Sequence, residues 1–235
     1  MPRYRPSILI NDAYGSAGET TWYHRDGKCY TRKRSHSVYG ATSAQLAHLD
    51  VHRRALAAWR SIPHSTQLLW NQLAADVEPH RPPFDHLAHI SGQNLFVSAY
   101  HGFATLGNEH LPQPQAFSPF PAMAVSLLDA HVEGGTLVVP AVVDMGTEEN
   151  PNRYRLLSKL QLITPGKGCD TGLLRNYLAD RPCGEDDIAI RIPDYISRSG
   201  LDLDQYQVHG RFILLDIVTG YRSQYQKNSI LIRLI

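Results

Sequence analysis

Between residues 42 and 107, apolar side chains recur every three or four positions, which is the period of an α-helix. In the first such stretch they share one helical face, formed by Leu46, Leu49, His52, Leu56 and Trp59. Thr42 and Ser43 stand at its start, where a short hydroxyl side chain can accept a hydrogen bond from a free amide of the first turn. The pattern therefore predicts a helix that begins at Thr42 or Ser43.

A second helical pattern follows almost at once, with Pro63 suited to its first turn and Ser65 or Thr66 suited to be its N-cap. Its apolar positions form two neighbouring rows, one of Leu69, Leu73 and Val77 and the other of Trp70 and Ala74. A third helix is predicted over 91–106, with Gly107 ending it. The short link makes the first two helices antiparallel neighbours, and their aromatic side chains are expected to pack a core.

Beyond residue 121 the pattern changes to that of β-strands. Strands are predicted over 124–130, 137–143, 154–163, 187–192, 207–218 and 229–235. Several short strands with turns between them and little helix indicate an antiparallel β-sandwich. Residues 171–179 break the pattern, and we expect a helical turn or a long loop there.

Before the helices, residues 20–24 and 28–32 have strand propensity and flank Asp26 and Gly27. An Asp-Gly pair strongly favours a type I′ turn, because both central positions need positive φ. We therefore predict a β-hairpin, preceded by a loop over 15–19, with Trp22 and Tyr30 paired across its strands. A lone hairpin is marginal in water, so we expect this one to dock on the helices or on another subunit.

Together these patterns predict an α+β protein, with an N-terminal β-hairpin and helical segment followed by an antiparallel β-sandwich. Residues 1–110 would hold the hairpin and three helices, 111–121 a proline-rich linker, and 122–235 the sandwich domain. Proline at the density found in the linker favours extended, helix-free backbone.

Charge adds a candidate site at the amino terminus. The whole chain has a net charge of only +1, but residues 1–40 contain seven Arg and Lys against three Asp and Glu. The candidate nucleic-acid or partner-binding residues are Arg25, Lys28, Arg32, Lys33, Arg34, Trp22 and Tyr30. Cations suit phosphates and aromatic rings stack on bases. The alternative is a solvated surface that keeps an edge strand from pairing wrongly.

The connection between the second and third helices is rich in metal-ligand types, namely His80, Asp85, His86 and His89. Their spacing matches no known metal-binding signature, so we expect no metal and no cofactor. Pro82 and Pro83 are expected to stiffen the connection. A metal-dependent hydrolase that uses these histidines is the enzymatic alternative.

No nucleophile elbow, phosphate-binding loop or dinucleotide fingerprint is present, so we expect a non-enzymatic protein without catalytic residues. Three cysteines without CxxC spacing argue against a disulfide framework, although Cys169 and Cys183 could pair. The apolar runs are too short to span a bilayer, and the first residues do not have the pattern of a signal peptide. We expect synthesis in the cytoplasm and no association with membranes.

Two resemblances add to these expectations. The stretch 210–223, through Asp216, Thr219, Gly220 and Ser223, resembles the last hairpin of fibronectin type III-like domains. This resemblance implies a sandwich of the fibronectin or immunoglobulin type.

The first 110 residues resemble a group of uncharacterised phage- and prophage-associated proteins of anaerobic gut bacteria. The resemblance is carried by Gly18, Trp22, Tyr23, Gly27, Tyr30 and Arg32, then by Thr42, Gln45, Trp59, Trp70, Ser91, Gly92, Asn94 and Phe96. It implies a structural or assembly component of a virion or prophage that binds protein partners or itself. The alternative function is a nucleic-acid- or glycan-binding module, using the hairpin or the sandwich loops.

Overall fold

The computed structural model of this chain describes residues 3–4, 15–17, 19–25, 28–33, 42–77, 90–108, 110–116, 118–200 and 202–235. It has the predicted α+β fold, with helices and antiparallel sheets. Contacts group the residues into two units. The first holds the described residues within 1–50 and 77–90, and the second holds 51–76 and the described residues from 91 to 235.

The first unit contains a small antiparallel sheet with the strand order β1-β4-β3-β2. Its strands are β1 (Arg3–Tyr4), β2 (Gly15–Ala17), β3 (Thr20–Arg25) and β4 (Lys28–Lys33). The predicted hairpin is confirmed as β3 and β4, whereas the loop predicted over 15–19 is wrong because β2 pairs with β3. Asp26 and Gly27 lie outside the described residues, so the type of their turn stays a prediction.

The three predicted helices are present as α1 (Ser43–Ser61), α2 (His64–Asp76) and α3 (Gly92–Thr105). At the start of α1, the Oγ1 of Thr42 accepts a hydrogen bond from the amide of Gln45, whose side chain accepts one from the Thr42 amide. This reciprocal pair is a capping box. Among the described helices, none is long and apolar enough to cross a membrane.

The predicted N-cap of α2 and the predicted start of α3 can both be compared with the structure. The carbonyl oxygen of Pro63 accepts a hydrogen bond from the amide of Gln67 at 3.1 Å. Ser65 and Thr66 therefore lie inside the first turn of α2, and the prediction that either caps it is wrong. The third helix, predicted to start at Ser91, begins one residue later at Gly92, and the side chain of Ser91 caps it by accepting a hydrogen bond from the amide of Asn94.

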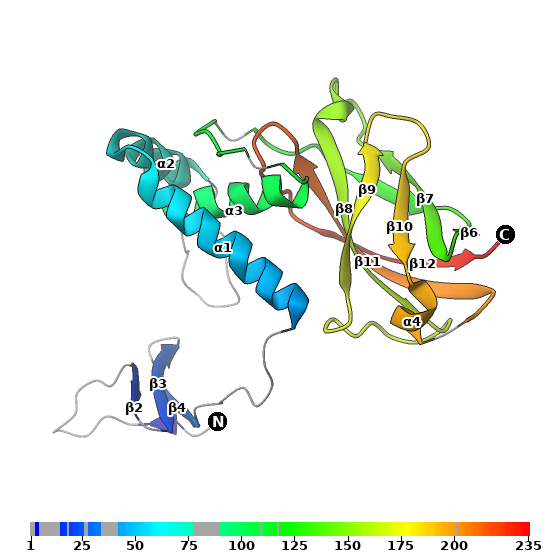
Figure 1. The fold of residues 1–235 in the computed structure, drawn as a ribbon, viewed down its shortest axis with the longest axis horizontal. Helices are drawn as coiled ribbons and strands as arrows, with labels where there is room; N and C mark the ends of the chain where they lie inside the picture. The colour runs from blue at the N-terminus through cyan, green and yellow to red at the C-terminus, as the bar shows by residue number, and fades with distance from the viewer. Residues whose placement is uncertain are drawn as a thin grey trace. The chain divides into compact units, whose positions relative to one another are not determined.

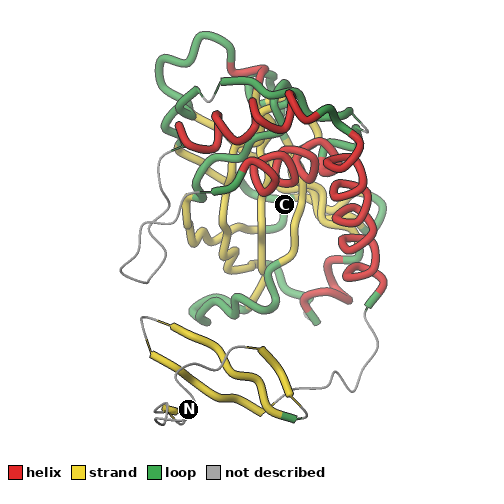
Figure 2. Tube along the Cα trace, turned by 90° about the vertical axis from the view of Figure 1, so that its left-hand side faces the viewer, coloured by secondary structure: helices red, strands yellow, loops and turns green. Residues whose placement is uncertain are grey.

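The second unit contains two antiparallel sheets that face each other as a sandwich (Figures 1 and 2). One has the order β10-β7-β5 with β6 also paired to β7, and the other has the order β12-β11-β8-β9. The strands are β5 (Ala124–Leu127), β6 (His131–Glu133), β7 (Thr136–Asp144), β8 (Tyr154–Ile163), β9 (Arg175–Pro182), β10 (Ala189–Pro193), β11 (Gln205–Asp216) and β12 (Gln226–Arg233). Two short helices, η1 (Pro151–Arg153) and α4 (Tyr195–Ser199), lie in the connections.

Alternate residues of these strands point into one core between the sheets. Its largest fully buried side chains include Tyr206, Phe212, Leu156 and Ile190. Polar side chains also link strands of the two sheets. Asn228 of β12 donates a hydrogen bond to the carbonyl oxygen of Val125 in β5 at 3.1 Å. On the other side, the carboxylate of Asp180 in β9 accepts a hydrogen bond from the amide of Ala189 in β10 at 2.8 Å.

The prediction of a helical turn or loop over 171–179 holds for residues 171–174, which form a turn, but is wrong for 175–179, which belong to β9 and pair with β8. Strand β9 is the last strand of its sheet, and Ala179 is its only fully buried residue. A mostly polar edge strand lacks the apolar alternation by which strands are recognised.

Helices α2 and α3 belong to the same unit as the sandwich, lying beside the turn after β11 (Figure 1). This grouping differs from the predicted division, which places the helices with the hairpin. The reason is a close backbone contact. A Cβ atom on Gly102 of α3 would overlap the carbonyl oxygen of Gly220, and one on Gly220 would overlap the carbonyl oxygen of Ala99. We call this approach the helix–turn contact.

Side chains surround the helix–turn contact on both sides. Trp70 of α2 is fully buried, and its ring and the Tyr221 ring pack edge to face with centroids 6.4 Å apart. Arg222 donates hydrogen bonds of 3.0 Å to the carbonyl oxygen of His101 and to the hydroxyl of Thr105. Helices α2 and α3 thus form one packed unit with the sandwich.

We expect Gly102→Ala to lower the free energy of unfolding by roughly 1–3 kcal/mol, the usual effect of overpacking. A decrease in the free energy of unfolding would be diagnostic of the contact. In a helix without it, alanine stabilises the protein relative to glycine by about 1 kcal/mol. Urea unfolding followed by circular dichroism measures the change. Gly168→Ala is the matched control, since nothing lies near its Cβ position. An unchanged or raised stability of the Gly102→Ala variant would contradict the helix–turn contact.

Candidate functional site

In the N-terminal sheet, two tyrosines and an arginine form one cluster. Tyr23 of β3 lies opposite Tyr30 of β4, and their rings stack with centroids 5.7 Å apart. The guanidinium carbon of Arg32 lies 5.7 Å from the centroid of the Tyr23 ring. A cation over an aromatic face is attracted by the quadrupole of the ring. This basic aromatic cluster therefore presents a positive charge and two rings side by side.

The strand register separates other members of the predicted set. Trp22 lies opposite Thr31, so it points to the other face of the sheet from Tyr30, and the predicted pairing of Trp22 with Tyr30 is wrong. Lys33 forms an exposed ion pair with Glu19 at 3.5 Å. Tyr23, one of the aromatic residues interleaved with the basic side chains of this hairpin, shares a face with Tyr30 and Arg32 because the register places Tyr23 opposite Tyr30.

Among the remaining predicted residues, Arg25 and Lys28 lie opposite each other in the β3–β4 register. Arg34 lies outside the described residues, as do His80, Asp85, His86 and His89. The prediction about these histidines is therefore untested.

Within the described ranges, no group of three or more His, Cys, Asp or Glu side chains is placed to hold a metal ion. His52 of α1 and His101 of α3 do meet, with a ring nitrogen of each separated by 3.4 Å and the rings stacked 5.7 Å apart. The two imidazoles form a contact between α1 and α3.

Cys169 and Cys183 are both free thiols, so the alternative that they form a disulfide is wrong. Cys183 is buried, and burial raises the pKa of its thiol to about 12. A thiol with such a pKa is protonated at neutral pH and is a poor nucleophile. Cys169 is exposed.

The turn after β11 is shaped by the buried carboxylate of Asp216. One oxygen accepts hydrogen bonds from the Arg153 guanidinium at 2.6 and 3.0 Å, and the other accepts one from the amide of Val218 at 2.8 Å. The hydrogen bond to Asp216 raises the pKa of Arg153. Asp216 therefore fixes the backbone that presents Gly220 to α3.

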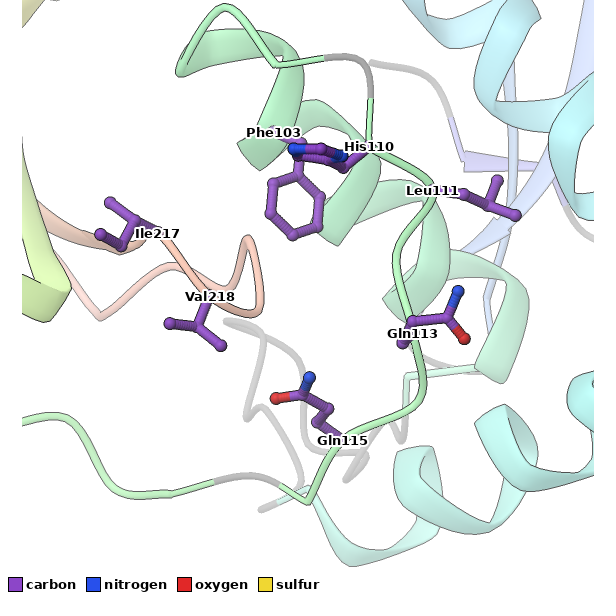
Figure 3. Close-up of a pocket in the computed structure, with 7 residues that line it drawn as sticks. All are labelled: Phe103, His110, Leu111, Gln113, Gln115, Ile217 and Val218. Carbon is purple, nitrogen blue, oxygen red and sulfur yellow. The ribbon is translucent and has the colours of Figure 1, made fainter.

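A cavity of about 460 Å³ lies next to this turn (Figure 3). We call it the amide cavity, and it is lined by Phe103, His110, Leu111, Gln113, Gln115, Ile217 and Val218. Its walls offer apolar surface, two amides and an imidazole, which can both donate and accept hydrogen bonds. This chemistry suits a neutral polar ligand.

Tyr221 holds one wall of the amide cavity in place. Its hydroxyl donates a hydrogen bond to the carbonyl oxygen of Gln115 at 3.2 Å. Burial raises the pKa of Tyr221 to about 12, so the hydroxyl keeps its proton at neutral pH. Phe103 and His110 meet edge to face, with ring centroids 6.2 Å apart. These contacts connect the cavity to the helix–turn contact.

The first half of α1 has an exposed apolar surface. Every residue from Thr42 to Asp50 is exposed, including Leu46 at 54% and Leu49 at 40%. Ala55 is the one buried residue of this 19-residue helix. Trp59, near its other end, packs on Phe96 with ring centroids 5.4 Å apart. The predicted apolar face is thus packed at its second half and exposed at its first.

Comparison with models of known protein families and with curated proteins found no match.

We expect Asp216→Ala to lower the free energy of unfolding by roughly 1.5–3 kcal/mol, the size of a hydrogen bond to a charged group. The variant leaves Arg153 and the amide of Val218 without their acceptor. Hydrogen exchange should also become faster at the amides of residues 218–220. The control is Asp186→Ala, an exposed carboxylate whose loss should change stability by less than about 0.5 kcal/mol. Equal effects of the two substitutions would contradict the role given to Asp216.

Proposed function

We propose that this chain is a non-enzymatic structural or interaction protein that assembles with protein subunits as a virion or prophage-encoded component. The observation that supports this most directly is the first half of α1, where Leu46 and Leu49 lie on one face and are both exposed. Contiguous apolar surface on a helix is typical of a site covered by another protein. The sequence resemblance to phage-associated proteins agrees with this proposal.

The partner proposed for this face is a second copy of the chain. Two-fold pairs are the commonest homo-oligomers, and in them the same patch serves both subunits. Leu46 and Leu49 can form such a self-complementary patch, because two antiparallel α1 helices can place these leucines of both copies together. A net charge of +1 also opposes self-association only weakly.

For the β-domain, we propose a fibronectin type III-like sandwich. Immunoglobulin-like sandwiches often carry a tyrosine near the start of a strand whose hydroxyl bonds to the backbone a few residues upstream. Tyr206, the second residue of β11, is fully buried and its Oη accepts a hydrogen bond from the amide of Leu203 at 3.1 Å. Together with the packed antiparallel sheets, this contact supports the proposal. Domains of this type commonly act in protein recognition, which agrees with an assembly role.

The double substitution of Leu46 and Leu49 by Glu should convert an associating protein into a monomer, because it places four carboxylates in the paired interface. Light scattering during size-exclusion chromatography over a range of concentrations measures this. The matched control replaces Leu68 and Leu69 of α2 by Glu, since these leucines are 48% and 49% exposed. The proposal fails if the unmodified chain is a monomer throughout, or if only the α2 control dissociates.

The second candidate function is a nucleic-acid-binding module, and the basic aromatic cluster favours it. Tyr23, Tyr30 and Arg32 combine two rings with a cation that has no carboxylate partner among the described residues. Single-stranded nucleic acid is bound by this combination of stacking and phosphate contact. A glycan is the other ligand class proposed, and the neutral amide cavity supports it because amides suit sugar hydroxyls.

For nucleic acid, Arg32→Ala should weaken binding of a mixed-sequence single-stranded DNA and reduce the salt dependence by about 0.7, the value for one lost phosphate contact. Lys33→Ala is the matched control, because Lys33 is paired with Glu19 and should contribute less. Fluorescence anisotropy at several salt concentrations measures both. Absence of binding by the unmodified chain at low salt would exclude this function, and equal losses in both variants would exclude the basic aromatic cluster as its site.

A further inference from the structure

Three basic residues form a row across the sheet that contains β8, β11 and β12. The register places Lys159 opposite Arg211 and Arg211 opposite Lys227. Their neighbours Leu160 and Phe212 point into the core, so the row lies on the outer face of the sheet. Like charges directly opposite each other on adjacent strands are destabilising. We call this arrangement the cationic row.

Carboxylates do not neutralise the cationic row within the part of the chain that the structure describes. In the sandwich, the described carboxylates that form ion pairs do so with Arg153 and Arg191. The ring of Tyr225 is the group that stabilises the row. The Arg211 guanidinium carbon lies 5.1 Å and the Lys227 ammonium nitrogen 5.8 Å from its centroid. One ring attracts both cations and holds them together without cancelling their charge.

A cavity of about 510 Å³ opens beside Arg211 and Lys227. We call it the cationic cavity. His209, Ser229 and Thr171 also line it, and they add an imidazole and two hydroxyl groups. Its volume lies in the range of small-molecule sites.

The 164–174 loop, which supplies one wall of the cationic cavity, is fastened to the sheet. A ring nitrogen of His209 hydrogen-bonds to the carbonyl oxygen of Lys167 at 2.9 Å. The side chain of Gln161, which lies opposite His209 in the register, accepts a hydrogen bond from the amide of Asp170 at 2.8 Å. Both anchors lie in the cross-strand row next to the cationic row. The cavity is therefore formed before any ligand binds.

We propose that the cationic cavity binds a small ligand that carries a sulfate or phosphate ester on a hydroxyl-bearing, sugar-like body. Arg211 and Lys227 supply the positive charge that such an oxyanion needs, and the planar guanidinium can donate two parallel hydrogen bonds to it. Ser229 and Thr171 supply hydroxyl groups for the sugar body. A cavity of about 510 Å³ favours a small ligand over a nucleic-acid strand, which is bound along an extended groove.

The test compares glucose 6-sulfate, glucose 6-phosphate, glucose and inorganic sulfate, each titrated into the full chain and followed by calorimetry. We expect one or both esters to bind, with an affinity that falls as the salt concentration is raised. Glucose should show no binding. The double variant Arg211→Gln, Lys227→Gln should weaken this binding at least tenfold, which corresponds to about 1.4 kcal/mol. Arg191→Gln is the matched control, because Arg191 is a paired cation on the other sheet.

Folding of the double variant can be checked independently by its melting temperature, which should change little because the loss of repulsion within the cationic row offsets the loss of both contacts with the Tyr225 ring. Three results would overturn the proposal. In the first, neither ester binds the unmodified chain. In the second, inorganic sulfate binds as tightly as the esters, which excludes a contribution from the sugar. In the third, a single-stranded oligonucleotide binds at Arg211 and Lys227 more tightly than either ester.

Discussion

The approach of Gly102 to Gly220 is the constraint on which the second unit depends. Neither residue has a side chain, so the backbone of α3 packs directly on the backbone of the turn after β11. Gly220 has φ of 73°, a conformation that glycine adopts at no steric cost. Asp216 holds that turn through Arg153 and the amides of the turn, so a buried carboxylate and its partly buried arginine partner fix where the helix lies.

Periodicity was sufficient to predict most elements but not the contact that joins them. α1, α3 and β8 follow strong patterns of period 3.6 or 2, and each was predicted close to its observed bounds. The helix–turn contact depends on Gly102 and Gly220, which have no side chains to keep the two backbones apart. A glycine inside a helical pattern weakens the prediction of the helix, and a glycine after a strand indicates only a turn. Nothing in a one-dimensional pattern shows that these two positions meet.

The candidate sites were harder to predict for a related reason, because each depends on the register of paired strands. A count of charges over residues 1–40 cannot separate the two faces of a sheet, so Trp22 and Tyr30 were grouped although they point to opposite sides. Predicting the cationic row would require the register of three strands at once. Lys159, Arg211 and Lys227 are far apart in the sequence, and only the alignment of β8, β11 and β12 brings them together.

The electrostatics of the sandwich differ between its two sheets. On the sheet that contains β10, Arg191 has carboxylate partners in Glu133 and Asp180. At the buried turn, Asp216 likewise has Arg153. On the outer face of the other sheet, the described residues offer the cationic row only the ring of Tyr225. Charges left uncompensated beside a preformed cavity lose little of their solvation there, yet they repel one another until an anion arrives. Binding an anion would therefore relieve repulsion that folding leaves in place, and this links the stability of the outer face to its occupancy.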